Sequence, residues 1–139
     1  MHRSRNHFQE DYRLKIDSLL IEDAVTASRK ISIKEAIDIL YHKHVGSIVI
    51  IDNNGKCEGI FTERDAIRVV SSNISLSKPL EEVMTTNLKT VKQGATFSEA
   101  KNIMMSNNIR HLPVTDKQGK FIGLLSLRMI LDEIHNMHS

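Results

Sequence analysis

The residues of this sequence best placed for chemistry lie in the segment Gly59-Ile60-Phe61-Thr62-Glu63-Arg64-Asp65. A hydroxyl residue between an apolar strand and a helix caps that helix, so we expect Thr62 to start a helix over residues 63–71. Asp65 follows three residues later and faces the same way. The hydroxyl, the carboxylate and the unpaired N–H groups of the first turn then surround one spot, which suits a polar or anionic ligand. A carboxylate beside a hydroxyl can bind a vicinal diol such as ribose.

An alternative interpretation of Asp65 is purely structural, because the helix dipole alone favours an acidic residue in the first turn. The two interpretations differ in the expected effect of a substitution. If the carboxylate serves a ligand and only marginally the helix, Asp65→Ala weakens ligand binding with little loss of fold stability, and this is our expectation.

The sequence contains an internal repeat that bears directly on this site. Residues 16–70 recur as residues 80–134 without insertion or deletion, and apolar positions meet apolar ones. Such a repeat indicates a copied structural unit, so two half-sized copies make one domain. The second motif has Met129 where the first has Asp65, and a thioether is a poor acceptor for a diol. We therefore predict that the two copies differ in ligand binding.

Each copy has the pattern strand, helix, strand, turn, strand, helix, which predicts an α/β fold with one sheet per copy covered by two helices. In the first copy the expected elements are an extended piece at 25–27, a helix capped by Ser32 with Glu35, strands 47–51 and 57–61 joined by a turn at 52–55, and the helix 63–71. In the second copy they are a helix capped by Thr96 with Glu99, strands 110–115 and 121–125 joined by a turn at 116–119, and a helix capped by Ser126. The expected organisation is a basic arm at 1–13, repeats at 14–71 and 80–136, and a serine-rich linker at 72–79.

Composition restricts the class of protein. The chain has 139 residues, of which 40% are hydrophobic, and this fits one compact domain. With 19 Lys and Arg against 17 Asp and Glu, no net field favours nucleic acid or a membrane. The single Cys57 excludes an intrachain disulfide, and the sequence shows no zinc-site spacing, membrane-spanning run or export leader. The expected location is the cytoplasm.

Taken together, the motifs resemble a tandem pair of cystathionine-β-synthase (CBS) domains, the Bateman module, over nearly all of residues 14–136. The residues that carry the resemblance are Thr26, Glu35-Ala36, Gly46-Ser47-Ile48-Val49, Gly59 and Thr62-Glu63-Arg64-Asp65 in the first copy, and Thr90-Val91, Glu99-Ala100, Arg110-His111-Leu112-Pro113-Val114 and Gly123 in the second. The resemblance implies two pseudo-twofold-related β-α-β-β-α units packed sheet to sheet. It also implies two equivalent clefts between them, each able to hold an adenine nucleotide, as in small stand-alone CBS proteins.

The family's binding pattern can be carried over position by position. It implies that Thr62 and Asp65 bind the ribose. Basic residues of the opposite copy meet the phosphates in the family, and here Arg110 and His111 occupy those positions in reversed order. The positions that match the adenine contacts are Thr26, Val45, Gly46, Ser47 and Ile60.

The second cleft of such a pair is expected to be defective. Met129 replaces the acidic residue after Ser126, and Gly46 and Ser47 stand where the other copy has its basic pair. We therefore predict one nucleotide per chain, with the second cleft empty, filled by side chains or used for something else. Arg128 could still offer a phosphate contact there, although a solvated or salt-bridged arginine is the simpler interpretation.

These observations predict a non-catalytic regulatory module that binds AMP, ADP or ATP and changes its affinity for a partner protein, as an energy sensor does. S-Adenosylmethionine, NAD and dinucleotide messengers also occupy modules of this family, so the physiological adenine compound stays open. One alternative is an assembly domain whose clefts bind nothing. Another is a nucleic-acid-linked regulator that uses the basic arm Met1–His7, although terminal arms are commonly just disordered.

Other candidate features favour simpler roles. Asp65 and His111 could supply a carboxylate and an imidazole to an enzyme, but a diol clamp and a phosphate contact explain both. His42 with His44, and His135 with His138, are histidine pairs of a kind that is usually solvated, so no metal and no obligatory cofactor are expected.

The helices also predict self-association. They carry more apolar residues than one pair needs to close its own core, and exposed apolar patches usually mark an interface. The chain is therefore expected to be at least a homodimer. The residues assigned to the outward surface are Ile67, Val69, Val70, Ile130 and Ile134.

Overall fold

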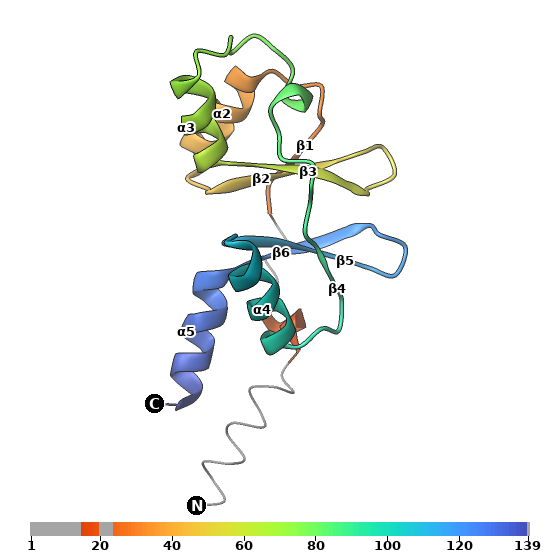
Figure 1. Cartoon of the computed structure of the whole chain (residues 1–139). Coiled ribbons are helices and arrows are strands. Elements are labelled where there is room, and N and C mark those ends of the chain that lie inside the picture. Colours follow the sequence, from red (N-terminus) through yellow and green to blue (C-terminus); the bar gives the residue numbers. More distant parts are fainter. Residues whose placement is uncertain (1–14, 20–23, 139) are drawn as a thin grey trace, which may run out of the picture. The chain divides into compact units, whose positions relative to one another are not determined.

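The computed structural model of the chain describes residues 15–19 and 24–138, which form two compact units (Figure 1). The N-terminal unit is Asp23–Leu88, and the C-terminal unit is Lys89–Ser139 together with the described part of Met1–Glu22. The basic arm at 1–13, including Met1–His7, lies outside the described residues.

In the N-terminal unit, three strands form one sheet in the order β1-β2-β3. Strand β1 (Thr26–Ala27) runs parallel to β2 (Ser47–Ile51), and β2 runs antiparallel to β3 (Cys57–Thr62). Helices α2 (Ile33–Lys43) and α3 (Glu63–Ser71) both lie on one face of this sheet (Figure 1). The predicted order of elements is confirmed for this copy.

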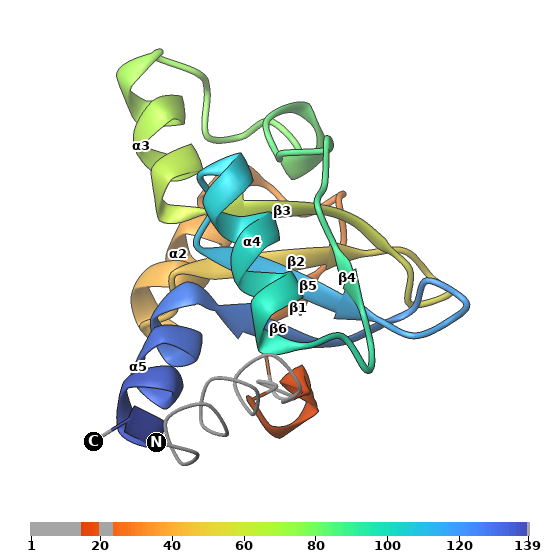
Figure 2. The same cartoon turned by 60° about the horizontal axis from the view of Figure 1, so that its bottom comes forward.

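The C-terminal unit repeats the arrangement. Its sheet has the order β4-β5-β6, with β4 (Val91–Lys92) parallel to β5 (His111–Thr115) and β5 antiparallel to β6 (Phe121–Ser126). Helices α4 (Phe97–Asn107) and α5 (Leu127–His138) pack on one face of this sheet (Figure 2). The fold is therefore mixed α/β, with a three-stranded sheet and two main helices in each unit.

The predicted helix starts are confirmed by their capping bonds. Helix α2 begins after Ser32, whose hydroxyl oxygen accepts a bond from the Glu35 backbone N–H at 3.0 Å. Helix α4 begins in the same way, because the Thr96 hydroxyl oxygen accepts a bond from the Glu99 N–H at 3.1 Å. Each bond satisfies one of the backbone donors that the first helical turn leaves unpaired. Because such bonds join residues three positions apart, the sequence alone predicts these capping pairs.

The turns between the paired strands are also local in origin. The Asp52 carboxylate accepts bonds from the N–H groups of Asn54 at 2.8 Å and Lys56 at 3.0 Å. Gly55 adopts a φ of 81°, a conformation that costs glycine little and other residues much more. The turn thereby fixes the register of β2 against β3.

Each sheet contributes alternate residues to a core beneath its helices. In the N-terminal unit, Ile48, Ile50 and Phe61 pack against the buried face of α2, made by Ile33, Ala36 and Leu40. Val49 lies between Ile48 and Ile50 and therefore points to the opposite face of the sheet. This alternation explains the unbroken apolar run of β2.

The prediction that five apolar helix residues face outward is wrong for some of them. Ile67 and Val70 are exposed, but Val69 and Ile130 are fully buried in the cores of their units. Ile134 is half-buried against the core of the C-terminal unit. Successive helical residues are turned by about 100°, so adjacent valines of α3 face different surroundings.

The short helix at the start of each sequence repeat packs in the unit formed mainly by the other repeat. The 3-10 helix η1 (Ile16–Leu19) belongs to the C-terminal unit, where Ile16 is part of the core. The 3-10 helix η2 (Leu80–Glu82) belongs to the N-terminal unit, where Leu80 and Val83 join the core. Each packing unit therefore completes its core with the leading segment of the other sequence repeat.

The segment after α3 is tied to the N-terminal unit. The N–H groups of Ile33 and Lys34 donate to the carbonyls of Lys78 and Leu76, both at 2.9 Å. Farther on, Thr85 forms an isolated bridge with Ile60. The close approach requires a glycine next to Ile60, because a Cβ on Gly59 would lie 2.8 Å from the Thr85 carbonyl oxygen.

Candidate functional site

The start of α3 has a reciprocal capping arrangement built from the two predicted ribose-binding residues. The Thr62 hydroxyl oxygen accepts a bond from the Asp65 N–H at 3.2 Å, and Asp65 Oδ2 accepts one from the Thr62 N–H at 3.0 Å. Thr62 lies opposite Ser47 on the neighbouring strand, and the Glu63 N–H donates to the Gly46 carbonyl at 3.1 Å. The structure thus brings these predicted residues of one unit together.

The Asp65 carboxylate has further partners. Arg68 Nη2 lies 3.5 Å from Asp65 Oδ1 and donates to the Val83 carbonyl oxygen at 2.7 Å. The Thr85 hydroxyl donates to both oxygens of the carboxylate, at 3.3 Å to Oδ1 and 3.4 Å to Oδ2. With these neighbours the Asp65 side chain is only 13% exposed.

This geometry corrects the expectation that Asp65 is only marginally needed for the helix. Its Oδ2 atom satisfies the N–H of the cap residue Thr62, which no intrahelical carbonyl can reach. Its Oδ1 atom takes part in the contacts to Arg68 and Thr85. Loss of the carboxylate therefore affects the start of α3 and the segment that carries Thr85, as well as any ligand.

Three of the predicted adenine-binding residues, Thr26, Ser47 and Ile60, belong to strands of the same sheet, and Val45 and Gly46 immediately precede β2. Thr26 pairs with Val49, and Val49 pairs with Ile60, so these three residues form one row across β1, β2 and β3. Thr26 is exposed, whereas Ile60 is buried. The Val45 N–H donates to the Leu40 carbonyl at the end of α2, at 3.3 Å. Because directly paired residues point to the same face, Thr26 and Ile60 lie with Val49 on the face of the sheet opposite α2 and α3.

The equivalent position of the C-terminal unit has the same backbone and different chemistry. The Ser126 hydroxyl oxygen accepts a bond from the Met129 N–H at 3.2 Å, and the Leu127 N–H donates to the Arg110 carbonyl at 2.8 Å. His111 lies opposite Ser126, as Ser47 lies opposite Thr62. Met129 supplies no carboxylate here, so the cap persists without a diol acceptor.

Comparison with known proteins identifies the family. A family model described as the CBS domain matches residues 16–72 and 80–136. The chain belongs to the CBS-domain family. It is 30% identical over 125 residues to an uncharacterized 17.7 kDa protein of Acidianus ambivalens, a match that covers 90% of this chain and 76% of that protein.

Two solved CBS structures match most of the chain. The CBS domain pair of protein MJ0100, in complex with 5'-methylthioadenosine and S-adenosyl-L-methionine, matches with a TM-score of 0.81 and 28% identity, covering 88% of this chain and 96% of that one. The CBS domain protein PAE2072 from Pyrobaculum aerophilum, complexed with AMP, matches with a TM-score of 0.80 and 26% identity, covering 88% and 99%.

Enzymes also occur among the relatives, but they are much longer. The chain spans about a quarter of the length of the inosine-5'-monophosphate dehydrogenases that it matches. The catalytic activities in their names therefore belong to proteins of which the CBS pair is a part.

The remaining predicted site residues lie in the second CBS repeat. Arg110 is exposed just before β5, and His111 is the half-buried first residue of that strand. Sequence reasoning missed Thr85 and Arg68 at the Asp65 carboxylate. The Thr85 contact spans 20 residues, and no short motif signals it.

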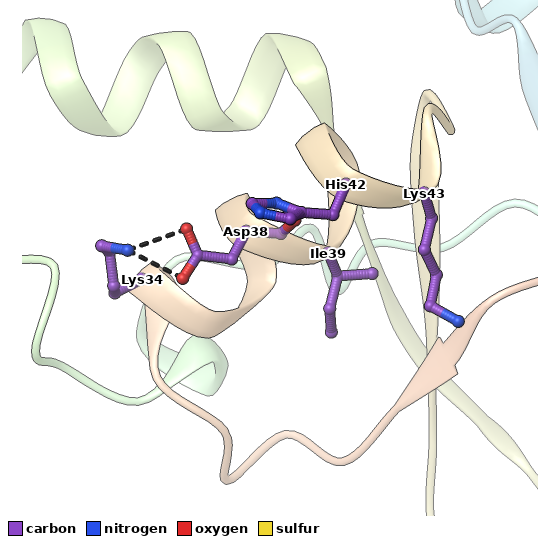
Figure 3. Close-up of a pocket in the computed structure, with 5 residues that line it drawn as sticks. All are labelled: Lys34, Asp38, Ile39, His42 and Lys43. Carbon is purple, nitrogen blue, oxygen red and sulfur yellow. Dashed lines mark hydrogen bonds and ion pairs between the residues drawn. The ribbon is translucent and has the colours of Figure 1, made fainter.

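A depression on α2 has a different character. It is lined by residues of this one helix, including Lys34, Asp38 and His42 (Figure 3). Lys34 Nζ lies 2.8 and 2.7 Å from the two Asp38 oxygens, and His42 Nδ1 lies 3.0 Å from the Asp38 carbonyl oxygen. These contacts follow the i,i+4 spacing of an exposed helix face, which is solvated rather than built around a ligand.

Three further features of the described residues bear on other functions: potential metal ligands, the length and hydropathy of the helices, and the reactivity of the cysteine. Within 15–19 and 24–138, no three His, Cys, Asp or Glu side chains gather as metal ligands, and no helix has the length and hydropathy to cross a membrane. The side chain of His138 lies outside the described part. Burial, followed by the charge of Asp52, raises the pKa of the Cys57 thiol to about 11, so at neutral pH this cysteine is protonated and a poor nucleophile.

Proposed function

We propose that this CBS pair is a non-catalytic regulatory module that binds an adenine nucleotide and controls a partner protein. The ribose diol binds Thr62 and Asp65, and the phosphates bind Arg110 and His111. The adenine lies against Thr26, Val45, Gly46, Ser47 and Ile60. The observation that carries the proposal is the carboxylate and hydroxyl at the start of α3, which only the first repeat possesses.

The choice of ligand follows from charge. AMP and S-adenosyl-L-methionine, which occur in the related structures, both contain adenosine and hence the ribose diol. They differ beyond the ribose, because AMP carries a phosphate and S-adenosyl-L-methionine a cationic sulfonium. An exposed arginine favours the phosphate through charge-assisted hydrogen bonds. We therefore propose AMP, ADP or ATP as the ligand.

The stoichiometry tests this proposal. Calorimetric titration with AMP should saturate at one nucleotide per chain, because the position of Met129 offers no acceptor for a second diol. In thermal unfolding, AMP at a hundredfold excess over its dissociation constant should stabilise the chain by about 2.7 kcal/mol. Absence of both effects would favour an assembly module without a ligand, and two equivalent sites would contradict the assigned roles.

We further propose that the chain forms a homodimer through the N-terminal unit. Tyr41 on α2 and Ile67 and Val70 on α3 are between 60% and 73% exposed. Tyr41 and Ile67 border a groove between the two helices that Leu40 and Ala66 also line. Large apolar side chains around a groove are typical of an interface.

Self-association can be disrupted by a single charge. Ile67→Glu should convert the dimer to a monomer at tens of micromolar in sedimentation velocity, because a carboxylate would have to be buried without a partner. Asn53→Glu, which adds the same charge to an exposed turn of the same unit, should leave the dimer unchanged. A monomeric wild-type chain would contradict this part of the proposal.

A further inference from the structure

The Thr85 hydroxyl is held against the carboxylate on which the proposed function depends. It donates to both Asp65 oxygens, at 3.3 and 3.4 Å. Its backbone is fixed by two bonds to β3, from the Ile60 N–H to the Thr85 carbonyl at 3.0 Å and from the Thr85 N–H to the Ile60 carbonyl at 2.9 Å. These two backbone bonds hold the Thr85 main chain in a position from which its hydroxyl reaches the Asp65 carboxylate.

The acceptor sites of Asp65 are nearly filled. Its Oδ2 atom accepts bonds from the Thr62 N–H at 3.0 Å and the Thr62 hydroxyl at 3.2 Å, and its Oδ1 atom faces Arg68 Nη2 at 3.5 Å. A carboxylate offers about four lone-pair positions. With Thr85 bridging both oxygens, no pair of positions is left for the two hydroxyl groups of a diol.

One of the present donors must therefore leave when a diol binds. Thr62 caps α3: its N–H has no other acceptor in the helix, and its hydroxyl is held at Oδ2 because the hydroxyl oxygen also accepts the Asp65 N–H at 3.2 Å. Arg68 carries a charge and is anchored by the Val83 carbonyl at 2.7 Å. Thr85 makes long, bifurcated bonds and is exposed, so its hydroxyl can rotate and donate to water instead.

We propose that the Thr85 hydroxyl is an internal competitor for ribose: it occupies the position of a ligand hydroxyl on Asp65 and lowers the affinity of the site for diol-containing ligands. This inference rests on the proposed function. It assigns to Thr85 a role in specificity, because a ligand without a diol has no need to displace it.

The test uses two substitutions of similar size. Thr85→Val removes the hydroxyl and keeps the shape, and it should tighten AMP binding by roughly two- to tenfold, the range of one ordinary hydrogen bond. Thr85→Ser retains the hydroxyl and should bind AMP within about twofold of the wild type. The 2',3'-dideoxy analogue of AMP should bind all three proteins equally in calorimetric titration.

A measurement on the protein without ligand completes the test. Because Thr85→Val removes a contact of the unliganded state, it should lower the thermal midpoint in the wild-type background and have a smaller effect in an Asp65→Asn background. If the wild type binds AMP and Thr85→Val binds it equally or more weakly, the inference fails and the proposed function stands. If neither protein binds AMP, both fail, whereas binding by Thr85→Val alone supports both.

Discussion

Asp65→Ala should weaken AMP binding by about ten- to hundredfold. The substitution removes the charged acceptor for the ribose diol, and a hydrogen bond to a charged group contributes about 1.5–3 kcal/mol. Asp65 is also the only one of the two equivalent positions in the repeats to carry a carboxylate, since the other is Met129. Calorimetric titration of the folded variant measures the loss directly.

The same substitution should also lower the free energy of unfolding, by about 1–2 kcal/mol, because the Thr62 N–H loses its acceptor. Met129→Ala is the matched control, since it lies at the same place after a capping serine and should leave AMP affinity unchanged. Asp65→Asn separates the two roles, because an amide oxygen can still cap the helix without the charge. An Asp65→Ala variant that is folded and binds AMP as tightly as the wild type would disprove the ribose role.

The parts of the site that depend on neighbouring residues were predictable from the sequence. The cap of α3 was predicted correctly because Thr62 and Asp65 are three residues apart, and helical geometry alone brings them together. The hairpin of β2 and β3 was predicted for the same reason, since the turn at Asp52 uses bonds within five residues. Local hydrogen bonding leaves a local signature.

Contacts between distant segments left no such signature. Nothing in the sequence near Thr85 indicates that its hydroxyl lies against Asp65, so this part of the carboxylate's structural role was not predicted. The error over Val69 and Ile130 has a different origin. An apolar residue in a short helix is compatible with a core or an interface, and only tertiary packing, which places Val69 of α3 in the core of its unit, decides which.

Arg110→Ala should weaken AMP and ATP binding by about ten- to hundredfold and change adenosine binding by less than about twofold. A guanidinium forms charge-assisted bonds with phosphate, and adenosine has no group that can accept them. The matched control is Arg128→Ala, which removes the same charge from the second repeat at a side chain that is 91% exposed, with an ion pair of 3.8 Å to Asp132. It should leave the affinities for all three ligands unchanged.

The loss of affinity caused by Arg110→Ala should also shrink as salt rises, because screening weakens the attraction between an exposed arginine and a phosphate in the wild type.

Met129→Asp should place a carboxylate after Ser126 without creating a second strong nucleotide site. Gly46 and Ser47 offer no cation at the positions where the second repeat has Arg110 and His111. A diol acceptor and a phosphate-binding arginine are both needed, and they contribute through different parts of the nucleotide. An Arg110→Ala penalty equal for adenosine and ATP, or a second strong site in Met129→Asp, would show that this division of roles is wrong.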